Sequence, residues 1–177
     1  MLQTLHNSIA SVCPIDGISI GALNDKSTWA VHFKAVATDQ QKSAATAIIQ
    51  AFDPNAPTFV EVNAERDRRL VKFPFGGKLY DFCDGRGSDI NIAGAGTLAL
   101  AAIMAGAQAN DLRWADPAVD FSWVAADNSI VTMDAQTCLN FAKAAADWKA
   151  KHIRKARALK DMNPIPADYA SDIRWTS

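Results

Sequence analysis

The sequence has no long apolar run, no excess of charge and few cysteines, and each of these properties excludes a class of protein. The apolar run over residues 93–107 is shorter than the roughly 20 residues that cross a bilayer, so we expect no membrane span. With 18 basic and 19 acidic residues the net charge is −1, which provides no global field to attract nucleic acid or an anionic surface. The N-terminus lacks the basic start and continuous apolar core of a secretory signal, which favours synthesis in a cytoplasm.

Cysteine and histidine show no spacing typical of a metal or redox site. Cys13, Cys83 and Cys138 lie far apart in the sequence, and we expect buried thiols. Because their number is odd, an oxidising environment would allow at most one bridge within a chain and leave one thiol free or available to a partner chain. The histidines fall on three different predicted elements, where we expect packing or surface roles.

No other group of residues forms a recognisable active site. Asp81, Asp84 and Asp89 can in principle approach a cation, but their neighbours do not follow a calcium-loop pattern, and turn chemistry is the favoured interpretation. The glycines at 94 and 96 lack the preceding strand and the third glycine of a dinucleotide-binding loop. We therefore predict no catalytic, cofactor-binding or metal-binding residues, no cofactor, and a protein that is not an enzyme.

The length and composition allow one moderate domain or two small ones. Of the 177 residues, 49% are hydrophobic, which is enough for a buried core. Two prolines within residues 53–57 disfavour helix and remove hydrogen-bond donors, which makes this segment the best candidate boundary. We predict an N-terminal module over residues 1–53, a proline-rich linker over 54–60, a second domain over 61–162 and an extended C-terminal tail over 163–177. The predicted class is α+β, with two small modules of antiparallel hairpins packed with helices and a long C-terminal helix.

The first module is predicted to contain a helix, two strands and a second helix. Apolar residues at helical spacing predict a helix over residues 2–13. Alternation of apolar and polar residues predicts two half-buried strands over residues 18–22 and 29–33, joined as a hairpin. Thr38 and Gln41 form a capping-box pattern at the start of the next helix.

An aromatic hairpin opens the second module. If Gly76-Gly77 forms a two-residue turn, Phe73 faces Tyr80, and the aromatic side chains share one face of the ribbon. In this register Pro74 occupies a non-hydrogen-bonded site. The N–H that proline lacks would have pointed outward, away from the second strand of the hairpin. We therefore expect the strand that contains Pro74 to be an edge strand, with further strands joining beyond the second strand of the hairpin.

Two helices and a second hairpin are predicted downstream. Ser88 is the expected cap of a helix over about residues 89–105, whose small side chains permit close approach of another helix or of the sheet, although its glycines can bend or delay it. Asp127-Asn128 tolerates the positive φ of a tight turn and joins the second hairpin. Asp134 caps a last helix over about residues 135–160. The apolar stripe of that helix consists of Cys138, Leu139, Phe141, Ala142, Ala145, Trp148, Ile153 and Ala156.

Two charged clusters leave several interpretations open. The second half of the last helix is basic, which suits a solvated face or an acidic partner surface, while contact with nucleic acid is less favoured. The arginines that precede the hairpin, Arg66, Arg68 and Arg69, suit bidentate ion pairs and bind either acidic groups of the same chain or a partner. The internal candidates are Asp81, Asp84 and Glu61.

Several motifs occur together in the second module. They are the arginine-rich segment Glu65-Arg66-Asp67-Arg68-Arg69, the hairpin with Phe73, Phe75, Gly77, Tyr80 and Phe82, the small-residue helix, and Trp123 with Asp127-Asn128 before the final helix. Over about residues 60–160 this pattern resembles a domain of unknown function that is common in bacteriophage tail-fibre and tail-assembly proteins. The first module, with Cys13-Pro14-Ile15-Asp16-Gly17, is similar to small N-terminal modules of phage and prophage proteins, including the XkdW-like family.

The resemblance implies a protein of a phage or prophage tail, located in the virion after synthesis in the host cytoplasm. It implies no catalytic residues, because that family has no assigned activity. The expected partners are other tail, fibre or baseplate proteins, in a symmetric oligomer. The candidate interface residues are Arg66, Arg68, Arg69, Phe73, Tyr80, Cys83, Tyr169 and Trp175.

Two roles compete within this interpretation. An adaptor that docks fibre or baseplate proteins and stays in the virion is preferred, because two compact modules and a C-terminus with spaced apolar residues suit permanent docking. The alternative is a chaperone that assists fibre assembly and then leaves. A hydrolase of cell-surface glycans is the least favoured role, since no suitably spaced pair of carboxylates supports it. In an extracellular particle, Cys83 can form a cross-link to a neighbouring chain.

Overall fold

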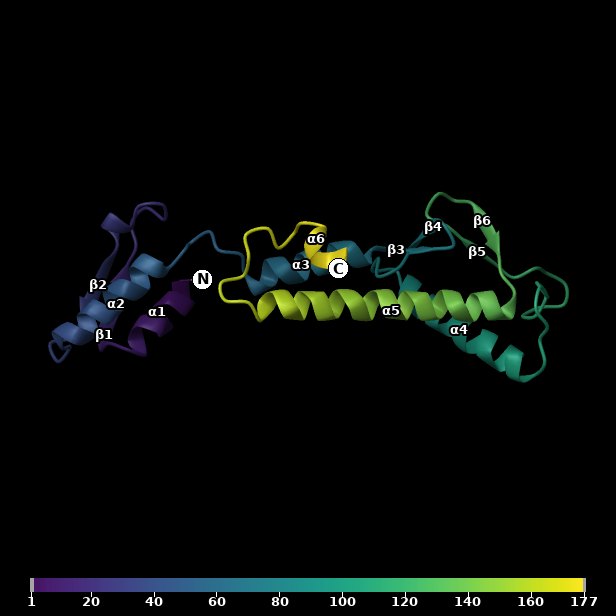
Figure 1. Ribbon diagram of the computed structural model, residues 1–177, viewed down its shortest axis with the longest axis horizontal. Helices are drawn as coiled ribbons and strands as arrows, with labels where there is room; N and C mark the ends of the chain where they lie inside the picture. Colours follow the sequence, from purple (N-terminus) through teal and green to yellow (C-terminus); the bar gives the residue numbers. More distant parts are fainter. Residues whose placement is uncertain (1, 177) are drawn as a thin grey trace. The chain divides into compact units, whose positions relative to one another are not determined.

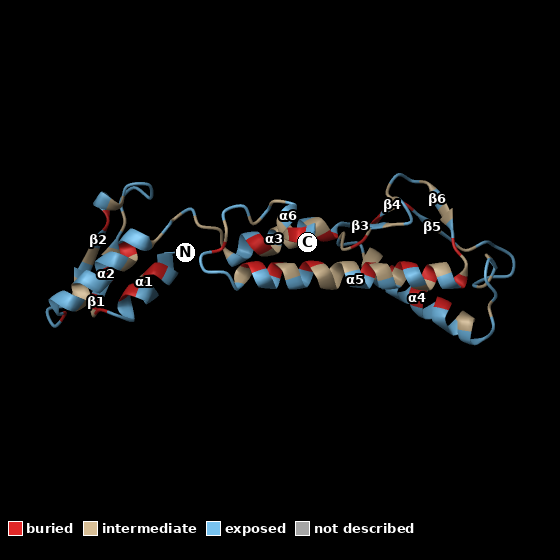
Figure 2. Cartoon of the chain, viewed as in Figure 1, coloured by how far each residue is buried: buried red, intermediate tan, exposed pale blue. Residues whose placement is uncertain are grey.

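Helices and short hairpins alternate along the chain, and the fold is α+β. The computed structural model describes residues 2–176, which form two compact units with their boundary between Thr58 and Phe59. Within this range the strands pair into three separate two-stranded antiparallel hairpins (Figure 1). Each unit has its own buried residues (Figure 2).

Unit 1, the part up to Thr58, contains the predicted order of helix, strand, strand and helix. Its elements are α1 (Leu2–Ala10), β1 (Ile15–Ser19), the 3-10 helix η1 (Lys26–Thr28), β2 (Ala30–Phe33) and α2 (Asp39–Ala51). The capping box is confirmed, because the backbone N–H of Gln41 donates to Thr38 Oγ1 (3.3 Å) and that of Thr38 donates to Gln41 Oε1 (2.9 Å). Buried side chains from both helices and the hairpin, including Leu5, Ile49 and Trp29, form the core.

The first strand of unit 1 starts and ends earlier than predicted. The backbone N–H of Lys34 donates to the carbonyl of Pro14 (3.1 Å), and strand pairing therefore begins at Ile15. Residues 20–22 lie in a loop, where the indole N–H of Trp29 donates to the carbonyl of Ala22 (2.8 Å). The prediction of a strand over 18–22 was wrong at its end, because a side chain takes the carbonyl that a partner strand would have bonded.

Unit 2, which begins at Phe59, contains a helix that the sequence patterns did not predict. Its elements are α3 (Phe59–Leu70), β3 (Lys72–Phe75), β4 (Lys78–Asp81), α4 (Ser88–Met104), β5 (Ser122–Val124), β6 (Ile130–Thr132), α5 (Ala135–Lys160) and α6 (Ile173–Thr176). The arginine-rich segment before the hairpin forms the second half of α3. Glu65 pairs there with Arg68 and Arg69, three and four residues later, a spacing that stabilises helices.

The register predicted for the aromatic hairpin is confirmed. Gly76 and Gly77 form the turn with φ angles of 56° and 77°, a conformation that glycine adopts without steric cost. Phe73 pairs with Tyr80, and their ring centroids lie 5.8 Å apart. β3, which contains Pro74, is an edge strand of a two-stranded ribbon.

The expected further strands beyond β4 are not found among residues 2–176. The sheet ends at β4, whose Leu79 carbonyl accepts a hydrogen bond from the backbone N–H of Ala126 (2.8 Å). Ala126 belongs to the turn that joins β5 and β6. The prediction was wrong because this turn, and not a third strand, contacts the edge of β4.

Helix α5 organises the main core of unit 2 through Phe141. The centroid of its ring lies 5.1 Å from that of Phe73, 4.8 Å from that of Tyr80 and 5.3 Å from that of Trp123. The predicted cap is confirmed, since Asp134 Oδ1 accepts a backbone N–H of the first helical turn (2.8 Å). A single ring thus joins the first hairpin, the second hairpin and the long helix.

One member of the predicted apolar stripe on α5 was wrong. Ile153 is 48% exposed, whereas its neighbour His152 is 3% exposed. The covered stripe continues from the partly buried Trp148 through His152 to Ala156, which is the spacing of one helix face. A polar residue therefore occupies the position expected for an aliphatic one.

Helix α4 begins without the side-chain cap predicted for it. Gly87 precedes the helix at a φ of 85°, and Ser88 lies inside the first turn, where its hydroxyl donates to Asp84 Oδ2 (2.8 Å). The helix continues through Gly94 and Gly96 and packs against α5. The close approach to another helix that the small side chains predict is therefore confirmed.

The two glycines of α4 should respond in opposite ways to replacement by alanine. A Cβ added at Gly96 would overlap the Cβ of Ala142 in α5, whereas a Cβ added at Gly94 meets nothing within 4 Å. Alanine favours a helix interior over glycine by about 1 kcal/mol, so we expect Gly94→Ala to stabilise unit 2 by up to about 1 kcal/mol. Because overpacking typically costs about 1–3 kcal/mol, Gly96→Ala should be less stable than Gly94→Ala by that amount.

Chemical denaturation of both variants measures this difference. Adding Ala142→Gly to Gly96→Ala removes the overlapping methyl group and should recover most of the loss. Equal stability of the two single variants would show that α4 and α5 are not in close contact at Gly96.

Candidate functional site

The C-terminal segment, residues 161–176, packs on α3 and α5. The extended tail predicted over 163–177 is wrong for this part of the chain, since turns lead into α6; residue 177 lies outside the described residues. Trp175 is 1% exposed and forms a second core of unit 2 with Val62 of α3 and Leu159 of α5. Trp175 and Ile165 of the segment are therefore covered by the protein's own helices, whereas Ile173 stays exposed.

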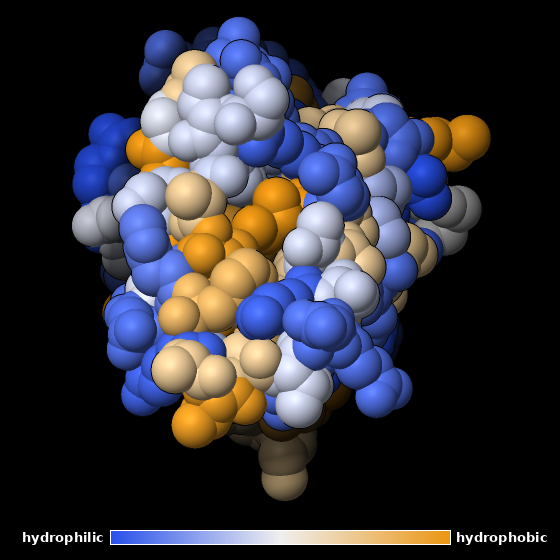
Figure 3. Space-filling model, turned by 90° about the vertical axis from the view of Figure 1, so that its left-hand side faces the viewer, coloured by the Kyte–Doolittle hydropathy of each residue, from blue (hydrophilic) through white to orange (hydrophobic). Residues whose placement is uncertain are grey.

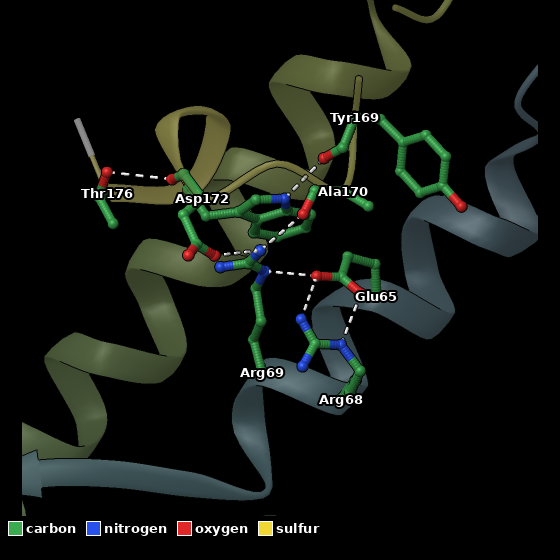
Figure 4. A network of polar contacts seen from close by, with 8 residues as sticks. Glu65, Arg68, Arg69, Tyr169, Ala170, Asp172 and Thr176 are labelled. Carbon is green, nitrogen blue, oxygen red and sulfur yellow. Dashed lines mark hydrogen bonds and ion pairs between the residues drawn. The ribbon is translucent and has the colours of Figure 1, made fainter. Parts of the chain in front are cut away.

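Glu65 is the centre of the polar cluster beside this core. Its carboxylate accepts two hydrogen bonds from Arg68, at 2.7 and 2.6 Å, and one from Arg69 Nε, at 2.6 Å (Figure 4). The side chain of Glu65 is 10% exposed and that of Arg69 is 11% exposed. A nearly buried carboxylate is tolerated here because two guanidinium groups donate to it.

Arg69 connects α3 to the C-terminal segment. One nitrogen of its guanidinium group donates to the carbonyl of Ala170 and to Asp172 Oδ1, both at 2.8 Å (Figure 4). The guanidinium carbon lies 5.2 Å from the ring centroid of Trp175, within the range of a cation–π contact. A single side chain thus binds a backbone carbonyl, a carboxylate and an aromatic face more than a hundred residues away in the sequence.

The charged state of the Glu65 cluster is favoured at neutral pH. Hydrogen bonds from Arg68, and then from Arg69, lower the pKa of Glu65 against the opposite effect of burial. The same contact with Glu65 raises the pKa of Arg68. Because the folded-state pKa of Glu65 lies below its unfolded value, the stabilisation is present above the unfolded value and is lost as the pH falls through the folded one.

His152 lies between two tryptophans beneath the C-terminal segment. Its ring centroid is 4.3 Å from that of Trp148 and 6.0 Å from that of Trp175, with an angle of 18° to the latter ring. Nδ1 lies 2.9 Å from the carbonyl of Trp148. Since a carbonyl only accepts, Nδ1 carries the proton.

We expect unit 2 to lose stability as the pH falls below about 6.5. Burial, together with the positive charges of Arg69 and Lys151, lowers the pKa of His152 from its ordinary value of 6.5. Below that value the unfolded chain binds more protons than the folded one, so acid favours unfolding. The free energy of unfolding, measured between pH 7.5 and pH 5.5, checks this sign.

His152→Gln is the control for the pH effect, because the amide does not titrate. The other histidines of the sequence, His6 and His32, belong to unit 1. The slope of stability against pH should therefore become smaller in this variant. An unchanged slope would assign the effect to another group.

The candidate interface residues divide into buried and accessible groups. Phe73, Tyr80 and Trp175 are at most 1% exposed, and the expectation that they contact a partner directly was wrong because they form the cores of unit 2. Arg68 keeps 67% of its side chain exposed although it pairs with Glu65. Arg66, Tyr169 and Cys83 are partly exposed. The structure brings Arg68 and Arg69 into one cluster with Tyr169 and Trp175 (Figure 4), but places the hairpin residues and Cys83 in or against the other core.

The arginines of α3 do not pair with Asp81 or Asp84, two of the acidic residues that were expected to bind them. Arg66 pairs with Asp67 at 2.7 Å, and the neighbouring arginines pair with Glu65 and Asp172. Arg86 instead pairs with Asp84 (3.1 Å) and, more distantly, with Asp81 (3.9 Å). The sequence patterns did not identify Glu65 and Asp172 as the partners. The spacing of Glu65 to the arginines three and four residues later was a signal for the first pair, but no local pattern indicates Asp172.

The acidic residues near the hairpin bond to the loop and to α5. Asp84 accepts the backbone N–H of Arg86 (2.9 Å) and the hydroxyl of Ser88, and these bonds lower its pKa to about 2. Asp89 accepts a hydrogen bond from Lys149 Nζ (2.9 Å). The turn chemistry expected for Asp84 is confirmed. Among residues 2–176 no cluster of three or more His, Cys, Asp or Glu side chains could hold a metal ion.

The cysteines differ in accessibility. Cys13 and Cys138 are buried, as predicted, and burial raises the pKa of the Cys138 thiol to about 11. Cys83 is partly exposed, with Sγ 3.7 Å from Asp89 Oδ2, and burial likewise raises its pKa. A protonated thiol is a weak nucleophile, so Cys83 is not activated at neutral pH.

Most basic residues in the second half of α5 bond to groups of the same chain. Lys149 bonds to Asp89, Lys151 donates to the carbonyl of Thr176 (2.8 Å), and Lys160 donates to Asn63 Oδ1 (2.9 Å). Two of these contacts reach α4 and α3, and a third reaches the C-terminal segment. Part of the positive charge of α5 is therefore used to fix other elements of unit 2.

Unit 2 is thus a small α+β domain with two cores. The two hairpins, α4 and the first half of α5 form one core, and α3, the second half of α5 and the C-terminal segment form the other. Residues 53–174 match the family described as domain of unknown function DUF4376, and the chain belongs to this family. No curated protein and no solved structure matches the chain. Within residues 2–176 no helix is both long enough and apolar enough to cross a membrane.

Proposed function

We propose that this protein is a non-enzymatic component of a bacteriophage tail, an adaptor that docks fibre or baseplate proteins and remains in the virion as part of a symmetric oligomer. The observation that carries the proposal is the resemblance of residues 60–160 to a domain of tail-fibre and tail-assembly proteins, centred on the hairpin with Phe73, Tyr80 and Gly77.

The use of charged residues in unit 2 supports a scaffolding role. Glu65, Arg69 and Asp172 hold the C-terminal segment against α3, and Lys149 with Asp89 joins α5 to α4. These contacts rigidify the domain, which is the property that a permanently docked adaptor needs. Rigid partners lose less conformational freedom when they bind.

The molecular surface supports docking to other proteins. On the face shown in Figure 3, apolar side chains gather in a patch with hydrophilic side chains around it. Exposed apolar patches with a polar rim are typical of surfaces that bind other proteins, membranes or ligands.

Mass spectrometry of purified phage particles tests the proposal. We expect peptides of this chain in washed particles, at a ratio to the major tail proteins that stays constant through repeated purification. Presence in the infected-cell lysate but absence from the particles would replace the adaptor with an assembly chaperone. Clearing of peptidoglycan by the purified protein would replace it with a hydrolase of the cell surface.

A further inference from the structure

A groove lies beside the end of α5 and the C-terminal segment of unit 2. Its volume is about 480 Å³, and α5, α6 and the residues between them contribute its lining. The apolar part of the lining consists of Ala158, Leu159, Met162 and Ile173. Met162 is 44% exposed and Ile173 is 72% exposed, so apolar surface remains in contact with water here. Ligand sites typically have volumes of about 300–1,000 Å³ and combine apolar walls with a few polar groups. The groove therefore has the size of a binding site.

Two of the three charged residues in the lining neutralise each other. Arg174 donates to Asp168 Oδ1 from Nε at 3.1 Å and from Nη2 at 2.8 Å. This pair contributes no net charge to the groove. Within residues 2–176 no acceptor contacts Nη1 of Arg174, so this nitrogen keeps its N–H groups for a further acceptor.

Lys155 gives the groove its net charge. It is partly buried, and it forms no hydrogen bond or ion pair with any other residue between 2 and 176. Its basic neighbours on α5 are bonded: Lys151 donates to the carbonyl of Thr176 at 2.8 Å, and Arg157 pairs with Asp161 at 2.7 Å. Because the other two charged residues of the lining form a neutral pair, the groove keeps one positive charge without a partner.

The charge and the walls together determine which group fits the groove. A carboxylate beside Lys155 would form a charge-assisted hydrogen bond, and Nη1 of Arg174 supplies a further donor. An apolar side chain next to that carboxylate would cover Met162 and Ile173, which water now contacts. A strand of nucleic acid fits less well, because its binding depends on several cations and on aromatic rings that stack on bases, and the lining has no aromatic ring.

We propose that this groove is the docking site for an acidic segment of a partner protein, in which a glutamate or aspartate stands beside an apolar residue. The carboxylate binds Lys155 and Nη1 of Arg174, and the apolar neighbour packs against Met162 and Ile173. The inference rests on the proposed docking role, since it makes the occupant a protein, and it adds the chemistry of the segment that docks.

A titration of the isotope-labelled full chain with a short peptide, followed by nuclear magnetic resonance, tests the site. The peptide has blocked ends and carries one glutamate between two leucines. We expect saturable shifts of the amide signals of Leu159 and Arg174, with a Kd of about 1 mM or below. Replacing the glutamate with glutamine, or both leucines with serine, should weaken binding by about tenfold or more, because each change removes one of the two matching features.

Variants of α5 separate this site from the general positive charge of the helix. Lys155→Gln should weaken binding of the peptide by about tenfold, since it removes the charged donor. Arg154→Gln is the matched control, because it removes the same charge from the adjacent, exposed position, which does not line the groove. It should change the Kd by about twofold or less. Lys155→Arg keeps the charge and should retain most of the binding, and circular dichroism verifies the fold of each variant.

Three results would overturn the inference. The first is a wild-type chain whose signals show no saturable shift. The second is an equal loss of binding in Lys155→Gln and Arg154→Gln, which would assign binding to the general charge of α5. The third is displacement of the peptide by a single-stranded oligonucleotide, which would make the groove part of a nucleic-acid surface. None of them would alter the detection of the chain in phage particles, and absence from the particles would leave the titration unchanged.

Discussion

Replacing Phe141 with alanine should lower the free energy of unfolding of unit 2 by about 3–5 kcal/mol, the range measured for large aromatic residues in protein cores. Phe141 is fully buried, and its ring lies within 5.4 Å of four aromatic rings on both hairpins. The cavity that alanine leaves has rigid walls on several sides, so the surrounding rings can close it only in part. We expect a fully folded protein at low temperature and an early transition on denaturation.

Phe59→Ala is the control for this experiment. Phe59 is 60% exposed at the start of α3, and surface substitutions usually change stability by no more than about 0.5 kcal/mol. In a Trp29→Phe background the remaining tryptophans all lie in unit 2, so fluorescence reports on that unit. A loss below about 1 kcal/mol for Phe141→Ala would show that the core can collapse around the missing ring.

Replacing Trp175 with alanine should detach the C-terminal segment, at a cost of about 3–5 kcal/mol. The indole provides the largest buried side chain of the second core, donates to the carbonyl of Tyr169 (2.7 Å) and carries the cation–π contact with Arg69. Hydrogen exchange of residues 161–176 should accelerate far more than exchange in the hairpins. The reason is that the substitution removes contacts of the segment and leaves the Phe141 core unchanged.

Two further variants separate the contributions of the indole. Trp175→Phe keeps much of the apolar area but loses the hydrogen bond. We expect it to lower the free energy of unfolding by about 1–3 kcal/mol, less than the alanine variant, since the Tyr169 carbonyl is left without its donor. Ile173→Ala, at a 72% exposed position of the same helix, should leave hydrogen exchange close to that of the wild type. Unchanged exchange in Trp175→Ala would mean that the polar contacts of Arg69 and Lys151 alone hold the segment.

Because several candidate interface residues are buried, the surfaces that a partner can reach differ from those expected. The aromatic hairpin is covered by α5, so its rings stabilise the domain and do not present a docking edge. Arg68, Arg66 and Tyr169 remain at least partly accessible on the α3 side of unit 2, and α4 carries exposed apolar side chains such as Ile90 and Met104.

Local residue patterns determined the features whose hydrogen bonds are made within a few residues. The glycine pair at 76 and 77 determined the hairpin register, Thr38 with Gln41 determined the start of α2, and Asp134 determined the start of α5. In each case the turn or cap is stable for reasons that do not involve the rest of the chain. These predictions were correct for that reason.

Only the tertiary structure decided how elements distant in sequence combine. It made His152 the buried residue in place of Ile153, covered Trp175 with α3 and α5, and bonded Arg69 to Asp172. It also ended the β3-β4 sheet at β4. Helical periodicity identifies a face but not what will lie against it, and a carboxylate a hundred residues away leaves no trace in local spacing. The sequence alone thus determined most of the elements, the caps of α2 and α5 and the α+β class. The cores, the ion-pair partners and the exposed side of α4 depend on which surfaces fold together.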